Sequence, residues 1–139
     1  YVLGDLMLGD NEEGCNCIRR LNGNIHIICG NHDTDTRIHF YEDKLDNVVE
    51  VVFATRINID GYHFYLSHYP SMTSNLEAEP NLKKNLINLF GHTHQQTNFY
   101  NEIPFMYHVG VDSHDCRLVS VGEIIHDCQA KLDDCLKYL

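Results

Sequence analysis

Three apolar runs in this chain each end at a glycine that is followed at once by a residue able to bind a metal ion. Val2-Leu3 leads into Gly4-Asp5, a run over 25–29 leads into Gly30-Asn31-His32-Asp33, and a run over 85–90 leads into Gly91-His92-Thr93-His94. Short apolar runs bounded by turn residues are typical of buried strands. Because open α/β sheets bind ligands at the carboxyl ends of their strands, the sequence predicts an α/β fold with a polar site there.

The remaining segments alternate between helical and strand patterns. The strongest local signal is a hairpin, in which Asp60-Gly61 supplies a tight turn between strands over 57–59 and 62–66. A final helix is expected after Ser120, because a serine followed three residues later by Glu123 forms a capping box. The other expected elements are a helix over 11–21, irregular or short helical segments over 34–46, strands over 48–53, 105–111 and 116–119, and a mobile polar surface loop over 71–84.

Composition limits both the size and the partners of the protein. With 139 residues and 43% hydrophobic content, the chain has enough material for one core, so we expect a single domain over residues 1–139. Its formal net charge of -10 disfavours binding to extended nucleic acid. No apolar run is long enough to span a bilayer, so we expect no membrane association and a cytoplasmic location.

Six cysteines in a chain of this length could form a disulfide framework, but their placement favours buried thiols. Cys128 and Cys135 share a helical spacing with apolar neighbours, which are Ile124, Ile125, Leu132, Leu136 and Leu139. Cys15-Asn16-Cys17 has no second cysteine pair with which to complete a zinc site. We therefore expect core cysteines rather than a metal site or disulfides.

The histidines near the third run indicate a metal site. In an extended segment, His92 and His94 would point to the same side. Together with Asp5, Asn31 and His68 they form a mixed oxygen and nitrogen ligand set, which suits Mn, Fe or Zn better than Ca or Mg. Each residue alone could be a turn former or a surface histidine, but their joint placement at strand ends favours the metal site.

The order of these motifs resembles the calcineurin-like metallophosphoesterases, whose pattern runs DxH, GD, GNH(D/E), a lone His and GHxH. Four of the five blocks are present, and the tail over 107–112 and 118–120 is similar to small bacterial and phage members. The resemblance implies a four-layer α/β/β/α sandwich. The DxH block is absent, since the only match, Asp112-Ser113-His114, follows GHTH. We expect a fragment that lacks the first strand, the alternative being a degenerate first metal site.

The resemblance also implies a residue for each role. Two divalent ions are expected, with Mn the first choice. Asp5 would bridge them, Asn31, His68 and His92 would complete the second site, and His94 would belong to the first. His32 would be the catalytic imidazole and Asp33 would orient it. The implied activity is hydrolysis of a small phosphomonoester or phosphodiester by a hydroxide held at the dinuclear centre.

Two other functions remain open at this stage. Some relatives use the fold as a protein-binding scaffold, although retention of His32 favours an enzyme. A nucleolytic module is disfavoured by the acidic charge and the short chain. Substrate identity and oligomeric state stay open, as do the roles of Arg37, expected to be solvated, and His108, which could orient a ligand. The other histidines are expected to be solvated or capped, and they are His26, His39, His63, His114 and His126.

Overall fold

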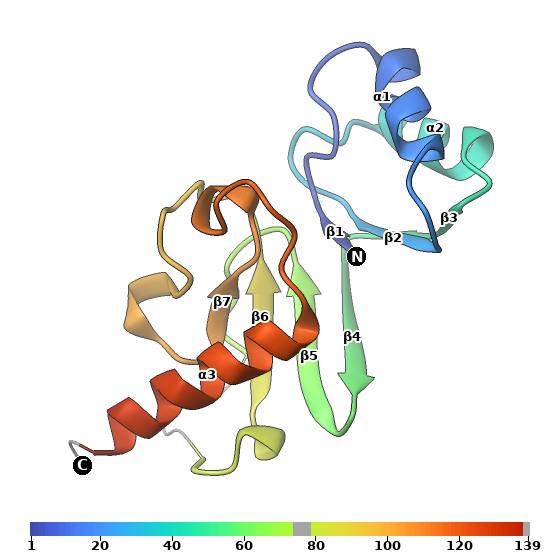
Figure 1. Ribbon diagram of the computed structural model, residues 1–139. Coiled ribbons are helices and arrows are strands. Elements are labelled where there is room, and N and C mark those ends of the chain that lie inside the picture. The colour runs from blue at the N-terminus through green and yellow to red at the C-terminus, as the bar shows by residue number, and fades with distance from the viewer. Residues whose placement is uncertain (74–78, 138–139) are drawn as a thin grey trace.

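The computed structural model describes residues 1–73 and 79–137, and these residues form two sheets and three α-helices (Figure 1). The first sheet is parallel in the order β1-β2-β3, with β1 at Val2–Leu3, β2 at Ile25–Ile28 and β3 at Val48–Val52. Helices α1 (Asn11–Arg19) and α2 (Asp35–Lys44) connect these strands in turn. This is the βαβ arrangement that parallel neighbouring strands require.

The second sheet has the order β4-β5-β6-β7. Its strands are β4 at Ala54–Ile59, β5 at Tyr62–Ser67, β6 at Leu86–Phe90 and β7 at Met106–His108. The predicted hairpin is confirmed, because β4 and β5 pair antiparallel around Asp60 and Gly61, which both have positive φ (53° and 83°). Strands β5, β6 and β7 run parallel, so their carboxyl ends lie at one edge.

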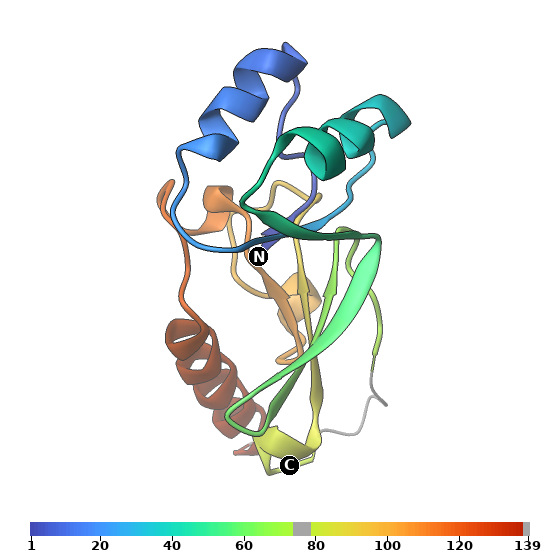
Figure 2. The same ribbon diagram turned by 90° about the vertical axis from the view of Figure 1, so that its right-hand side faces the viewer.

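One face of the first sheet packs against its two helices. This cluster buries Ile27 beneath α1 and α2, and its other buried members are Met7, Cys15, Ile18, Tyr41 and Leu45. Helix α1 begins at Asn11 because the Asp10 side chain accepts a hydrogen bond from the Glu13 backbone. Figure 2 shows both helices on the side of this sheet that faces away from the second sheet.

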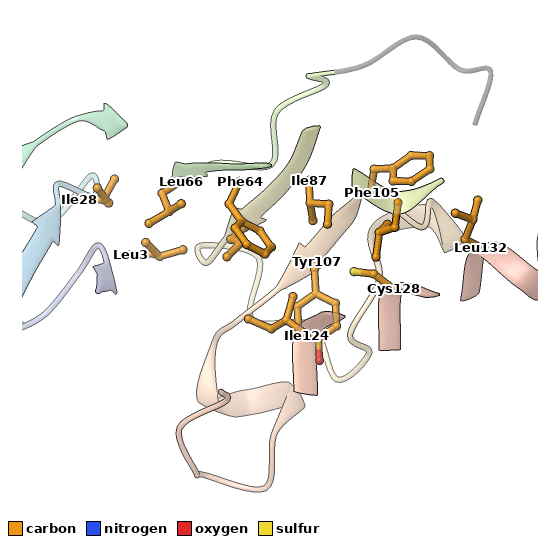
Figure 3. Packing of buried hydrophobic residues seen from close by; sticks show 12 residues of the cluster. Leu3, Ile28, Phe64, Leu66, Ile87, Phe105, Tyr107, Ile124, Cys128 and Leu132 are labelled. Carbon is orange, nitrogen blue, oxygen red and sulfur yellow. The ribbon is translucent and has the colours of Figure 1, made fainter. Parts of the chain in front are cut away.

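The opposite face of the first sheet joins a core shared with the second sheet. Ile28, next to Ile27 in β2, points the other way, as strand geometry requires. Figure 3 shows Leu3 and Ile28 beside Leu66, and α3 (Val121–Leu136) contributing Ile124, Cys128 and Leu132 further along the same cluster. The predicted capping box of α3 is confirmed, with Ser120 and Glu123 bonded reciprocally.

Some predicted elements differ from the structure. Residues 34–46 contain the regular helix α2, and no strand forms over 116–119, where Asp115 and Cys116 have positive φ (51° and 57°) and make a turn. The predicted loop over 71–84 lies partly outside the described residues, and its last three residues form a 3-10 helix, η1 (Leu82–Lys84). Leu139, predicted on the apolar face of α3, also lies outside them.

The cysteines are all free. Cys128 is buried, as predicted, whereas Cys135 is only half-buried; Cys15 and Cys29 are also buried, and Cys17 and Cys116 are exposed. Burial raises the pKa of the Cys128 thiol, which keeps it neutral. Among the helices of residues 1–73 and 79–137, none has both the length and the apolar character needed to cross a membrane.

Candidate metal centre

Four predicted ligands come together where strands of both sheets end. Asp5 follows β1, Asn31 follows β2, His68 follows β5 and His92 follows β6. Ligand atoms of Asp5, His68 and His92 all lie within 4.8 Å of one another. The two sheets therefore contribute to one cluster of oxygen and nitrogen atoms, hereafter the donor cluster (Asp5, Asn31, His68 and His92).

The shortest distances in the donor cluster centre on the ring of His68. Its Nε2 lies 2.8 Å from Oδ1 of Asn31, 3.1 Å from Nδ1 of His92 and 3.4 Å from Oδ2 of Asp5. Oδ1 of Asn31 also lies 3.0 Å from Nδ1 of His92. His68 is buried, whereas Asn31 and His92 are exposed, so the cluster opens to solvent on one side.

The tautomer of His68 is fixed by the backbone. Its Nδ1 lies 2.8 Å from the carbonyl oxygen of Leu3, which can only accept a hydrogen bond, so Nδ1 carries the hydrogen. In the neutral ring Nε2 is then a bare acceptor, yet it faces oxygen atoms of Asn31 and Asp5. Nδ1 of His92 also lies within hydrogen-bond distance of this Nε2 and of Oδ1 of Asn31, and this mixed set of oxygen and nitrogen atoms fits a divalent transition metal ion.

Two glycines allow the loops to approach this closely. A Cβ on Gly4, whose φ is +92°, would lie 2.2 Å from Nδ1 of His68. A Cβ on Gly30 would lie 2.3 Å from Oδ1 of Asp5. A side chain at either position would therefore displace a member of the donor cluster.

The carboxylate of Asp33 holds the first two loops together. Its Oδ2 accepts hydrogen bonds from the backbone of Asp5 (2.9 Å) and Gly30 (2.7 Å), and its Oδ1 accepts one from the buried Tyr41 hydroxyl (2.6 Å). Burial and the bond to Asp33 raise the pKa of Tyr41, so its hydroxyl remains a donor. Asp33 thus bonds to the loops instead of the His32 ring, and its predicted role in orienting His32 stays a prediction.

His32 stands next to the donor cluster with its side chain exposed. Its backbone N–H donates to Oδ1 of Asp5 (2.8 Å), and its carbonyl oxygen accepts from Arg37 (2.7 Å). Arg37 also donates to the carbonyl oxygen of Gly9 and the side chain of Asn11, so it is not the solvated arginine that the sequence suggested. These bonds fix the backbone of His32, and its catalytic role stays a prediction.

The GHTH segment is not extended, which corrects the argument from alternating side chains. His92 and His94 both have positive φ (60° and 47°), and no strand includes them. His94 does not belong to the three-residue metal group found among the described residues. Its Nδ1 instead lies 3.0 Å from Oδ2 of Asp112. The assignment of His94 as a metal ligand stays a prediction.

Two buried histidines lie at the end of β7 and in the segment that follows it, His108 and His114. Nδ1 of His108 lies 2.8 Å from the Ser113 hydroxyl, and Nε2 of His114 donates to the carbonyl oxygen of His108 (2.9 Å). Burial lowers the pKa of His108 to about 4, which keeps its ring neutral. His114 was expected to be solvated or capped, and it is buried against the Tyr107 ring with its Nε2 bonded to a backbone carbonyl.

Sequence reasoning missed two residues that support the donor cluster. The Tyr69 ring packs edge-on against His68 and His92, with ring centroids 5.0 and 4.5 Å away. Tyr41 lies in α2, within a segment for which the sequence predicted irregular or short helical structure. The only sequence feature that could have indicated Tyr69 was its position directly after His68. No sequence feature indicated a role for Tyr41.

The fold and the donor atoms define an α/β protein with a site suited to divalent metal ions. A family model described as the calcineurin-like phosphoesterase superfamily domain matches residues 1–132. The chain therefore belongs to this superfamily, whose members are generally metal-dependent hydrolases of phosphate esters. The family suggested by the sequence motifs and the predicted α/β fold are both confirmed.

A protein of unknown function from Aquifex aeolicus has a similar crystal structure, with a TM-score of 0.58. The two chains are 24% identical, and the match covers 89% of this chain and 73% of that one. At this identity the likeness shows the fold alone. A search of curated proteins finds no match.

Proposed function

We propose that this protein is a dinuclear metal-dependent phosphoesterase that hydrolyses small phosphomonoesters or phosphodiesters, with Mn²⁺ as its preferred ion. The observation that carries the proposal is the convergence of Asp5, Asn31, His68 and His92, whose oxygen and nitrogen atoms lie close enough together to bind one ion. The four residues would bind one ion. Asp5 would also bind a second ion, for which His94 would be a further ligand. When bound, such ions polarise a phosphoryl oxygen and lower the pKa of a coordinated water.

The protein's own residues would position the ester and move the proton. The His32 ring is exposed beside Asn31 and, within the described part of the chain, makes no hydrogen bond that would occupy it. An imidazole so placed can donate a proton to the leaving oxygen. Its backbone is bonded to Asp5 and Arg37, so the point from which the side chain projects is fixed relative to the donor cluster.

The test compares His32→Ala with His39→Ala, which removes an exposed histidine on α2 outside the donor cluster. We expect the Mn²⁺-loaded wild-type protein to hydrolyse an activated aryl phosphodiester or phosphomonoester. His32→Ala should lower kcat by at least about 100-fold, the usual contribution of a general acid, while His39→Ala should not. Metal content, measured by elemental analysis, should be the same in all three proteins. Equal rates for wild type and His32→Ala would contradict the catalytic assignment.

Chelation gives a second test. Removal of divalent ions should abolish turnover, and added Mn²⁺ should restore it. Full activity in the presence of a strong chelator, with no residual metal, would refute the metal-dependent reaction.

A further inference from the structure

His94 and Asp112 meet although they lie in different segments of the chain. His94 follows β6, and Asp112 lies in the 3-10 helix η3 (Val111–Ser113) that follows β7. Nδ1 of His94 is 3.0 Å from Oδ2 of Asp112. A carboxylate accepts hydrogen bonds, so Nδ1 carries the hydrogen and Nε2 of the neutral ring is left bare.

We propose that Asp112 is a positioning residue for the second ion, which holds Nδ1–H of His94 and leaves Nε2 free as the ligand atom. The inference rests on the proposed function, since it deepens the assignment of His94 as a ligand. A carboxylate in this position also makes the ring a stronger electron donor to a metal ion.

The turn that carries Asp112 is built on buried groups. The Ser113 hydroxyl accepts from Nδ1 of His108 (2.8 Å) and donates to the carbonyl oxygen of Gly110 (3.2 Å). Nε2 of His114 donates to the carbonyl oxygen of His108. The backbone N–H of Val109 bonds to the carbonyl oxygen of Phe90, directly before the GHTH segment. Asp112 is therefore presented to His94 by a fixed turn that runs beside the end of β6.

His68 shows the same arrangement within the donor cluster. There, the carbonyl oxygen of Leu3 holds Nδ1 and leaves Nε2 facing the other ligand atoms. An alternative is that His94 and Asp112 form an ordinary surface ion pair, because the His94 side chain is 79% exposed. Exposed ion pairs contribute little to stability, and an ordinary pair of this kind would leave Mn²⁺ affinity independent of Asp112. Metal binding and the tautomer of His94 therefore separate the two explanations.

The first measurement is a calorimetric titration of the metal-free protein with Mn²⁺. His94→Ala identifies the binding step that depends on this histidine. We expect Asp112→Asn to weaken that step by about 10- to 100-fold, which is the usual cost of losing such a partner. The amide keeps the shape of the carboxylate but can present an N–H to Nδ1, which moves the ring hydrogen to Nε2. The control is Asp115→Asn on the same turn, which is exposed and has a positive φ that asparagine tolerates.

The second measurement is the tautomer of His94, read from its ¹⁵N chemical shifts in the metal-free protein. We expect the Nδ1–H form in wild type and Asp115→Asn, and a loss of this preference in Asp112→Asn. Adding Asp112→Asn to His94→Ala should cost no further Mn²⁺ affinity, because Asp112 acts through His94. The inference would be overturned if Asp112→Asn changed neither the His94 tautomer nor the Mn²⁺ isotherm. It would also be overturned if His94→Ala left the Mn²⁺ isotherm unchanged. A wild-type protein that binds no Mn²⁺ would overturn the proposed function and this inference with it.

Discussion

Replacing Tyr41 by phenylalanine tests whether Asp33 organises the metal site. The Tyr41 ring is fully buried, and its hydroxyl donates a 2.6 Å hydrogen bond to Oδ1 of Asp33, which is 6% exposed. Phenylalanine keeps the ring and its packing, so the substitution removes little more than this bond. Hydrogen bonds to charged groups contribute about 1.5 to 3 kcal/mol, and we expect Tyr41→Phe to lower the free energy of unfolding by that amount.

The assay is urea unfolding of the metal-free protein followed by circular dichroism, with the slope of the transition unchanged. Metal-free protein is needed because a bound ion would add its own stabilisation. The control is Tyr65→Phe, since the Tyr65 hydroxyl bonds to no other residue in the described part of the chain and its ring is only half-buried. A loss below about 0.5 kcal/mol for Tyr41→Phe, equal to that of the control, would refute the reasoning, because surface-like substitutions stay within that range.

The remaining predictions concern backbone fit and pH. Gly4→Ala should abolish tight Mn²⁺ binding in a calorimetric titration, because its Cβ would collide with His68 at a positive φ, whereas Gly9→Ala, with open space around it, should not. Unchanged affinity for Gly4→Ala would contradict the close approach. His108 has its pKa lowered from 6.5 to about 4, so the unfolded chain takes up a proton first as the pH falls. Its contribution to stability is complete above pH 6.5 and is lost between pH 6.5 and 4, by roughly 1.4 kcal/mol per pH unit. His108→Gln should flatten the pH dependence of urea unfolding in this window, and an unchanged curve would rule out the neutral buried ring.

The parts of the fold that could be predicted from the sequence are those governed by local rules. The Asp60-Gly61 turn and the Ser120 capping box each depend on a few adjacent residues, and both are present in the structure. The apolar runs before Gly30 and Gly91 form buried strands for the same reason. Local signals of this kind survive folding because tertiary packing agrees with them.

The sequence predicted only irregular or short helical segments where α2 forms, because the apolar positions of this helix do not form one clear stripe. Only Tyr41 of this helix is buried, and it is held in place by packing on β2 and by the bond to Asp33. These contacts join residues that are distant in the sequence, so no local pattern reports them. The strand predicted over 116–119 does not form, because Asp115 and Cys116 adopt a turn with positive φ that the apolar pattern of the sequence does not indicate.

The donor cluster was predictable in its membership but not in its geometry. Ligand residue types after strand-ending glycines indicated Asp5, Asn31 and His92, and the lone histidine at the end of the predicted hairpin indicated His68. The structure brings all four together. The assumption of an extended GHTH segment was wrong, because both histidines adopt left-handed backbone angles. Such angles are set by the contacts of the whole site and not by residue type.

Asp5 and Asn31 follow strands of one sheet, whereas His68 and His92 follow strands of the other. A cation bound by all four residues would cross-link the two sheets at their interface. Thermodynamic linkage then requires that ion binding stabilise the packing of one sheet against the other, and that a shift of one sheet relative to the other lower the affinity for the ion. Repacking Leu66, where the two sheets meet, should consequently alter affinity without touching any coordinating atom.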